Sequence, residues 1–207
     1  MLSTFAANGA LNAFRNTSFN VSTLYVALFS VLPNIAGTGG TEISGSGYTR
    51  IAPTMGAASA GKITSTADVL FPVATGSWTN IIGYGLYDAS TSGNLLQFEY
   101  LSAAEPLPFT AATSDTITAP AHGLVNTDRI VLDAGEVGVL PTGLSATTVY
   151  FVISAATDTF QVSTTSGGAA VDITVGGSGL WRKVDVKTVA ATEQCKIATG
   201  NLTLALR

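Results

Sequence analysis

The sequence contains few charged residues. Only 11% of its 207 residues are charged, against roughly 25% in an ordinary soluble domain. Such a chain must cover its surface with Ser, Thr and Gly or with other protein chains, and we favour the second option because it fits a subunit of an assembly. The net charge is −4 and the Lys and Arg residues are scattered along the chain. Direct nucleic-acid binding needs cations gathered on one face, so we expect none.

Cysteine and histidine occur once each. Cys195 therefore has no intrachain disulfide partner, and His122 has no second histidine with which to complete a metal site. We interpret Cys195 as a small buried hydrophobe and His122 as a turn residue. No GxSxG motif lies between a predicted strand and a predicted helix, as a hydrolase nucleophile would require. We therefore expect no enzyme, with no catalytic residue, no metal and no cofactor.

Long hydrophobic runs are absent. None approaches the roughly 20 residues needed to cross a bilayer, and the N-terminus lacks the charged region and apolar core of a secretion signal. We therefore expect synthesis in a cytoplasm without export, and no membrane partner.

A central strand is predicted over 24–29, where Leu-Tyr-Val-Ala-Leu-Phe is almost continuously apolar and rich in β-formers. This composition is typical of a strand that is buried on both faces. Pro33 ends the strand, and five glycines between 37 and 47 predict a long loop. The next strand is predicted over 63–71, closed by Pro72.

A hairpin is predicted from strands at 78–88 and 95–101 joined by a turn. We interpret the aromatic residues of its first strand as core rather than as a sugar-stacking platform, and its glycines as points of close backbone approach. The second strand alternates Leu96, Phe98 and Tyr100 on one face with Gln97 and Glu99 on the other.

One helix is predicted over 3–16, capped by Ser3 or Thr4. Its residues are mostly apolar, although Gly9 costs about 1 kcal/mol relative to alanine. Two interpretations fit this charge-poor segment: the helix covers one end of its own β-core, or 1–20 is an arm that docks onto a neighbouring subunit. The residues predicted to contact other proteins are Phe5, Leu11, Phe14 and Phe19.

The sequence changes character at 105–108, Glu-Pro-Leu-Pro. From there to 184 it predicts five or six short strands at about ten-residue spacing, typical of a small barrel or sandwich. Alternating residues then resume, and 202–206 predicts a final strand. Because an insert needs host ends that lie close together, we expect Ala104 and Val184 to be neighbours.

The prediction is thus an all-β fold, a jelly-roll-like antiparallel β-sandwich with a short N-terminal helix and an inserted small β-barrel or sandwich. The predicted divisions are a helix or arm at 1–20, a discontinuous sandwich domain at 21–104 and 185–207, and an inserted β-domain at 105–184.

Five segments carry a resemblance to a known family: LYVALF, GTGGTEISGSGYTR, FPVATGSW, GYGLYDASTSGNLL and GNLTLALR. Together they resemble a family of small tailed-bacteriophage virion proteins described as tail-fibre-like or capsid decoration (cement) proteins. Within the insert, TITAPAHGLVNTDRIVL, LPTGLSATTVYFVI and DTFQVSTT resemble a β-module of phage tail and virion proteins. The resemblance implies a structural role and brings no active site.

We accordingly expect a virion structural protein, and we favour a capsid decoration subunit that binds and stabilises the head shell. Its expected partners are the major capsid protein or other virion proteins and further copies of itself, as a trimer, on the capsid surface rather than the tail. The alternative is a head- or tail-fibre module that recognises a host surface glycan. Long fibres usually need shaft repeats, and their absence from this sequence favours the capsid.

Overall fold

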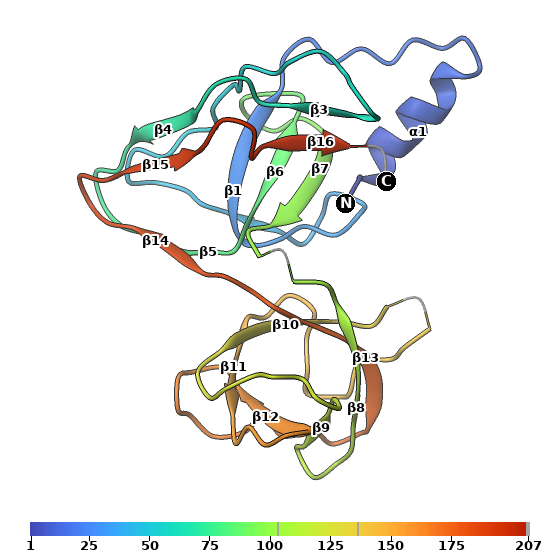
Figure 1. Ribbon diagram of the computed structural model, residues 1–207, viewed down its shortest axis with the longest axis vertical. Helices are drawn as coiled ribbons and strands as arrows, with labels where there is room; N and C mark the ends of the chain where they lie inside the picture. The colour runs from blue at the N-terminus through green and yellow to red at the C-terminus, as the bar shows by residue number, and fades with distance from the viewer. Residues whose placement is uncertain (103, 136, 206–207) are drawn as a thin grey trace. The chain divides into compact units, whose positions relative to one another are not determined.

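The computed structural model describes residues 1–102, 104–135 and 137–205, which form two compact units (Figure 1). The first unit is Met1–Leu101 with Val186–Arg207, and the second is Ser102–Asp185. Each unit has its own hydrophobic core. The all-β prediction, with one short N-terminal helix and a small barrel, is confirmed.

The elements of the first unit are α1 (Thr4–Ala13), β1 (Tyr25–Val31), β2 (Thr41–Glu42), β3 (Lys62–Thr64), β4 (Val69–Val73), β5 (Trp78–Ile81), β6 (Gly83–Tyr87), β7 (Leu95–Tyr100), β14 (Lys187–Val189), β15 (Gln194–Ile197) and β16 (Thr203–Ala205). The elements of the second unit are β8 (Leu107–Ala111), β9 (Ile117–Thr118), β10 (Arg129–Asp133), β11 (Tyr150–Ile153), β12 (Thr159–Ser163) and β13 (Gly177–Lys183).

The largest sheet of the first unit is antiparallel, in the order β2-β1-β6-β7. The predicted central strand is β1, whose residues 26–29 are all buried. Ala27 pairs with Gly85 of β6. At Gly83 an added Cβ would meet the backbone oxygen of Glu99 and the side chain of Leu32, so the expected close approach at this glycine is confirmed.

Three two-stranded antiparallel ladders, β14 with β5, β15 with β4 and β16 with β3, bring the C-terminal segment back into the first unit. Trp78 lies in the same core as Leu28 of β1, so the interpretation of this aromatic residue as core is confirmed. The predicted final strand is β16, and position 206 of that prediction lies outside the described residues.

The prediction that Pro72 ends a strand over 63–71 is wrong. The segment forms two strands, and Pro72 lies inside β4. Because the ladder with β15 is irregular between Leu70 and Val73, the pairing skips the proline, whose missing N–H is not needed there.

The alternation in β7 suggests that Gln97 and Glu99 share a polar face, but the surroundings of Gln97 are apolar enough to bury it. Gln97 is buried, and its amide Nε2 donates to the carbonyl oxygen of Thr203 at 2.8 Å while its Oε1 accepts from the backbone N–H of Ala205 at 2.9 Å. The amide thus ties β7 to β16. Both of its hydrogen-bonding groups are satisfied, which offsets the cost of burying them.

The second unit is a closed antiparallel barrel in the order β10-β11-β12-β9-β8-β13. In chain order its first strand is β8 and its last is β13. These two strands pair, with Leu107 opposite Trp181, so the chain enters and leaves this unit at the same end of their ladder. The distance between Ala104 and Val184 stays a prediction. Among the described residues, no helix is both long enough and apolar enough to cross a membrane.

His122 lies in the loop after β9, as predicted for a turn residue, but its ring is buried. Its Nδ1 accepts from the N–H of Leu124 at 2.9 Å, and its Nε2 lies 3.3 Å from the carbonyl oxygen of Thr159. The ring packs edge-on against Phe160 and Trp181. Both ring nitrogens therefore contact backbone groups of the barrel.

Candidate functional site

Helix α1 is fastened to the edge of the large sheet by the residues that precede it. Ser3 is the N-cap, since its Oγ accepts from the N–H of Ala6 at 3.1 Å, and the same hydroxyl donates to the carbonyl oxygen of Leu95. The backbone N–H of Ser3 donates to Leu96, and the N–H of Phe98 donates to Met1. The predicted Ser3 cap is confirmed, and the helix ends three residues earlier than predicted.

Gly9 has a packing role that its low helix propensity conceals. The helix lies so close to the ring of Phe19 that a Cβ at position 9 would overlap it. Phe19 also meets Phe5 edge-on, with ring centroids 5.7 Å apart. One side of α1 is thereby closed by the loop that follows it.

The four residues predicted to contact other proteins lie in different environments. Phe19 is half-buried against the core and pairs with Phe5, which is 42% exposed. Leu11 is 64% exposed and Phe14 is 89% exposed. The structure therefore brings Phe5 and Phe19 together and leaves Leu11 and Phe14 as exposed apolar side chains at the far end of α1. The role of all four in protein contacts stays a prediction.

An apolar groove of about 410 Å³ lies beside α1, between the helix and the β3–β16 ladder. Figure 1 shows α1 at the edge of the first unit, with β16 running towards its base and β3 antiparallel beside it. We call this feature the α1 groove, and Lys62 is the charged residue at its wall. Its walls include Ala6 and Ala10 of α1, Phe19 and Val21 of the next loop, Ile63 of β3 and Leu204 of β16.

Sequence reasoning missed the α1 groove because its walls come from segments far apart in the chain. Ala10 and Leu204 both line it although nearly the whole sequence separates them. The only signal in the sequence was the run of small alanines on one side of the helix, which lets the helix lie against a neighbouring surface without filling the space between them.

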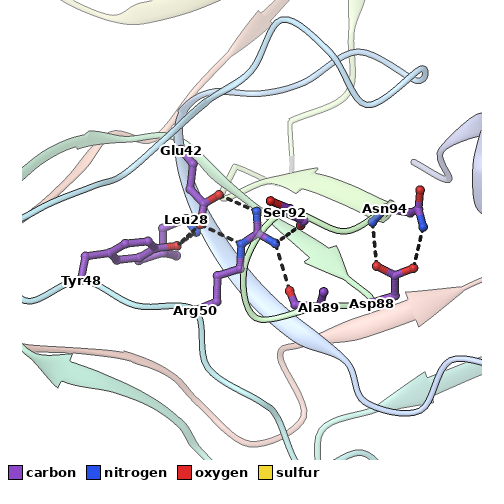
Figure 2. Close-up of polar contacts among 8 residues, drawn as sticks. All are labelled: Leu28, Glu42, Tyr48, Arg50, Asp88, Ala89, Ser92 and Asn94. Atoms are coloured by element: carbon purple, nitrogen blue, oxygen red, sulfur yellow. Dashed lines mark hydrogen bonds and ion pairs between the residues drawn. The ribbon is translucent and has the colours of Figure 1, made fainter.

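A second feature of the first unit is a cluster of polar side chains around Arg50 (Figure 2). The guanidinium donates to both carboxylate oxygens of Glu42, at 2.9 and 2.7 Å. It also donates to the carbonyl oxygens of Ala89 and Ser92 in the β6–β7 loop, at 3.0 and 2.7 Å, and its carbon lies 3.7 Å from the ring centroid of Tyr87. Arg50 therefore fixes the β6–β7 loop to β2.

Tyr48 extends this cluster into the sheet. Its hydroxyl donates to Glu42 at 3.0 Å and accepts from the N–H of Leu28 at 2.8 Å. Burial, chiefly, raises the pKa of the Tyr48 hydroxyl far above its usual value. Burial alone would lower the pKa of Arg50, but the hydrogen bonds and charge of Glu42 outweigh it, so this pKa is raised. The cluster therefore holds a firmly charged arginine and a neutral phenol, a combination suited to stabilising loops.

The β6–β7 loop is also closed on itself. Asp88 accepts from the backbone N–H of Asn94 at 2.6 Å and from its side-chain amide at 2.8 Å, as Figure 2 shows. With the contacts of Arg50, both ends of this loop are held in place. We interpret the whole cluster as structural.

The described residues offer few groups with catalytic chemistry. Cys195 is half-buried, and burial raises the pKa of its thiol, which disfavours the reactive thiolate. Within the described part of the chain, no three His, Cys, Asp or Glu residues lie together as a metal site would require. Leu11 and Phe14 are exposed apolar side chains, and the α1 groove beside the same helix is lined mostly by apolar residues.

The sequence was compared with known proteins. A family model described as "Gp80: Podophage GP4 fiber I protein gp80" matches residues 1–127, which is more than half of the chain. The match contains all of α1 and the whole Arg50 cluster. No curated protein matches the chain. The predicted relationship to phage virion proteins is thereby confirmed at the level of a fibre family, and the chain belongs to the podophage GP4 fiber I protein gp80 family of phage virion structural proteins.

Proposed function

We propose that the protein is a structural subunit of a phage fibre, held in the virion by contacts through Leu11, Phe14 and the α1 groove. The observation that carries this proposal is the match to a fibre family over 1–127, which includes all of α1. Phe14 in particular is an aromatic side chain almost fully exposed at the end of a helix. Aromatic side chains, Phe among them, are enriched at the cores of protein interfaces relative to the rest of the protein surface.

The charge-poor composition supports this assignment. A chain with 11% charged residues has little charge with which to cover its surface, and burial against other virion proteins removes part of that surface from water. We propose further that the subunit has no catalytic role and needs no cofactor. The half-buried Cys195 and the fully engaged His122 are the observations that support this part of the proposal.

Capsid decoration is the second candidate function. It is favoured by the absence of shaft repeats from the sequence, since a long fibre usually contains them. In that case the partner of α1 is the major capsid protein, and the subunit stabilises the head shell by adding contact area between its neighbours. Recognition of a host glycan is a finer version of the fibre proposal, and saturable binding of the purified protein to host envelope fractions tests it.

The location is tested by immunogold electron microscopy of intact virions, with an antibody raised against 109–184. Label confined to fibres is the expected result. Label spread over the head shell would overturn the fibre proposal in favour of decoration.

The contact surface is tested by incorporation of variants into virions. Deleting 1–20 would also remove Ser3 and Phe19, which hold or pack against the core, so point variants are sharper. We expect Phe14→Ser to reduce incorporation. The matched control is Leu70→Ser, because Leu70 is an exposed leucine of the same unit that does not line the α1 groove. Equal incorporation of both variants would contradict the proposed surface.

A further inference from the structure

The end of α1 and the α1 groove are complementary features of one chain. Leu11 and Phe14 project from the helix end with 64% and 89% of their surface exposed, and we call them the α1 knob. The groove beside the same helix is lined by apolar side chains such as Phe19, Ile63 and Leu204. We propose that the α1 knob of one copy inserts into the α1 groove of a second copy. This inference rests on the proposed structural role and names the partner of that surface.

The knob does not fill the groove of its own chain. Ala6 and Ala10 are the helix residues that line the groove. Leu11 is turned by about 100° from Ala10 around the helix axis, since an α-helix has 3.6 residues per turn. In this structure the knob is exposed while the groove is hollow, so both remain open to another molecule.

The size of the groove suits the knob. Cavities of about 150 Å³ already bind benzene, which is the size of the Phe14 ring. At about 410 Å³ the α1 groove has room for this ring together with a second apolar side chain. Leu11 lies three residues before Phe14, on the neighbouring part of the helix surface, so the two can enter together.

Charge selects among possible occupants. Helix α1 has no charged residue, and Lys62 is the charged residue of the groove wall. A basic peptide would place like charges beside Lys62, and an acidic peptide would have Lys62 alone as a partner, so its other charges would be buried unpaired, which is costly. A sugar would leave hydroxyl groups unpaired against the apolar walls. An uncharged apolar knob meets neither cost, and this chain itself carries one.

The contact between the α1 knob of one copy and the α1 groove of another can build a closed assembly of a few copies. If the contact is reciprocal, two copies exchange knobs and form a dimer. If each knob enters the next copy around a ring, a trimer or a larger closed ring results. Both arrangements bury the same residues, so both are tested by the same substitutions.

The first experiment measures the mass of the purified full chain by light scattering after size-exclusion chromatography, over a range of micromolar concentrations. We expect a concentration-dependent dimer or ring. Phe14→Ser should weaken the association at least about tenfold, because fully burying a Phe side chain contributes roughly 1.5–3 kcal/mol and 1.4 kcal/mol is tenfold. Leu70→Ser is the control and should leave the association unchanged.

The second experiment identifies the contact directly. In a Cys195→Ser background, a Phe14→Cys protein is mixed with an Ala58→Cys protein, since Ala58 is an exposed residue that lines the groove. Under oxidation we expect a disulfide-linked heterodimer, and a mixture with Leu70→Cys in place of Ala58→Cys should give far less. This readout does not depend on whether Phe14→Ser folds well.

A wild-type chain that stays monomeric across the range would overturn the inference. An association that Phe14→Ser does not weaken, and in which the Phe14→Cys and Ala58→Cys proteins form no disulfide-linked heterodimer, would overturn it too. If the monomer is found while Phe14→Ser still fails to enter virions, the occupant of the groove is a different virion protein. In that case the proposed function stands and the second-copy inference fails, so the two failures are distinguishable.

Discussion

The two units differ in how they treat the edges of their sheets. In the barrel, each strand pairs on both sides, from β10 around to β13. In the first unit, the large sheet ends at β2 and β7, and the residues before α1 cover part of the β7 edge. Closure removes edges to which another chain could add, whereas an open sheet must cover them. The first unit is therefore the one in which we propose that a helix and a groove bind a partner.

Each unit is also fastened by a different kind of polar group. In the first unit a charged pair, Glu42 with Arg50, holds loops together. In the barrel the imidazole ring of His122 does so from within an aromatic cluster. Each unit contains one tryptophan, Trp78 in the first and Trp181 in the second. Fluorescence in a Trp181→Phe or a Trp78→Phe background therefore follows each unit separately.

The largest effect is expected from Glu42→Gln. The side chain of Arg50 is only 8% exposed, so the substitution leaves its charge buried without a counter-ion. Breaking a buried pair costs about 3–5 kcal/mol, and the partial exposure of Glu42 places the expected loss near 3 kcal/mol. Urea unfolding followed by Trp78 measures the loss, and Trp181 should report an unchanged barrel.

The control for this prediction is Glu99→Gln. Glu99 pairs with the N-terminal ammonium at 2.8 Å, but both partners are well exposed. Exposed pairs contribute about 0–1 kcal/mol. Equal losses for Glu42→Gln and Glu99→Gln would show that burial does not distinguish the two pairs.

The next effect concerns the barrel. His122→Phe keeps an aromatic ring beside Phe160 and Trp181 but removes the acceptor of the buried Leu124 N–H. The carbonyl oxygen of Thr159 loses its contact with the ring but keeps the N–H of Ala156. Leaving buried polar groups unpaired costs about 1–3 kcal/mol, so we expect a loss of about 2 kcal/mol. The Trp181 transition should shift while the Trp78 transition stays in place. His122→Asn, whose amide oxygen can accept from Leu124, should recover part of the loss.

Gly9→Ala tests the packing of α1 with a smaller effect. Helix propensity alone predicts that alanine stabilises the helix by about 1 kcal/mol. The new Cβ overlaps Phe19, however, and overpacking costs about 1–3 kcal/mol, so we expect a net loss of about 1 kcal/mol. Thermal unfolding of unit one measures it, and Asn8→Ala, at an exposed helix position, is the control. A stabilised Gly9→Ala variant would mean that Phe19 moves aside without cost.

The sequence predicts what local pattern determines and misses what depends on distant pairing. The buried β1, the Ser3 cap and the series of short strands in the barrel follow from residues close together in the chain. Pro72 led to a wrong strand end, because a proline fits inside β4 only where the ladder with β15 is irregular, and the sequence does not show that pairing.

The same limit applies to the candidate site. The residues of the α1 knob were among the four predicted to contact other proteins, with Phe5 and Phe19, and that role stays a prediction. The α1 groove was not predicted, because it exists only once β16 returns beside β3. The Arg50 cluster was also missed, since a single arginine after a glycine-rich loop gives no sign that Glu42 and the β6–β7 loop converge on it.

The smallest expected effect is a dependence of the first unit's free energy of unfolding on high pH, caused by Tyr48. Burial raises the pKa of Tyr48 above its value in the unfolded chain, which is about 10. Above that pH the unfolded chain loses the Tyr48 proton while the folded unit keeps it, so the free energy of unfolding falls as pH rises. One such group lowers it by up to about 1.4 kcal/mol per pH unit. Below pH 10 this contribution is fully present.

Tyr48→Phe should therefore flatten the pH dependence of the Trp78 transition between pH 10 and 11 by about 1 kcal/mol. Burial also raises the pKa of Tyr87, so part of the slope should remain in this variant. At neutral pH the variant is itself less stable, because the N–H of Leu28 loses its acceptor, but that loss does not change with pH. The slope, rather than the stability at one pH, is thus the readout that isolates the buried phenol. A slope equal to that of the wild type would show that Tyr48 ionises in the folded unit as easily as in the unfolded chain.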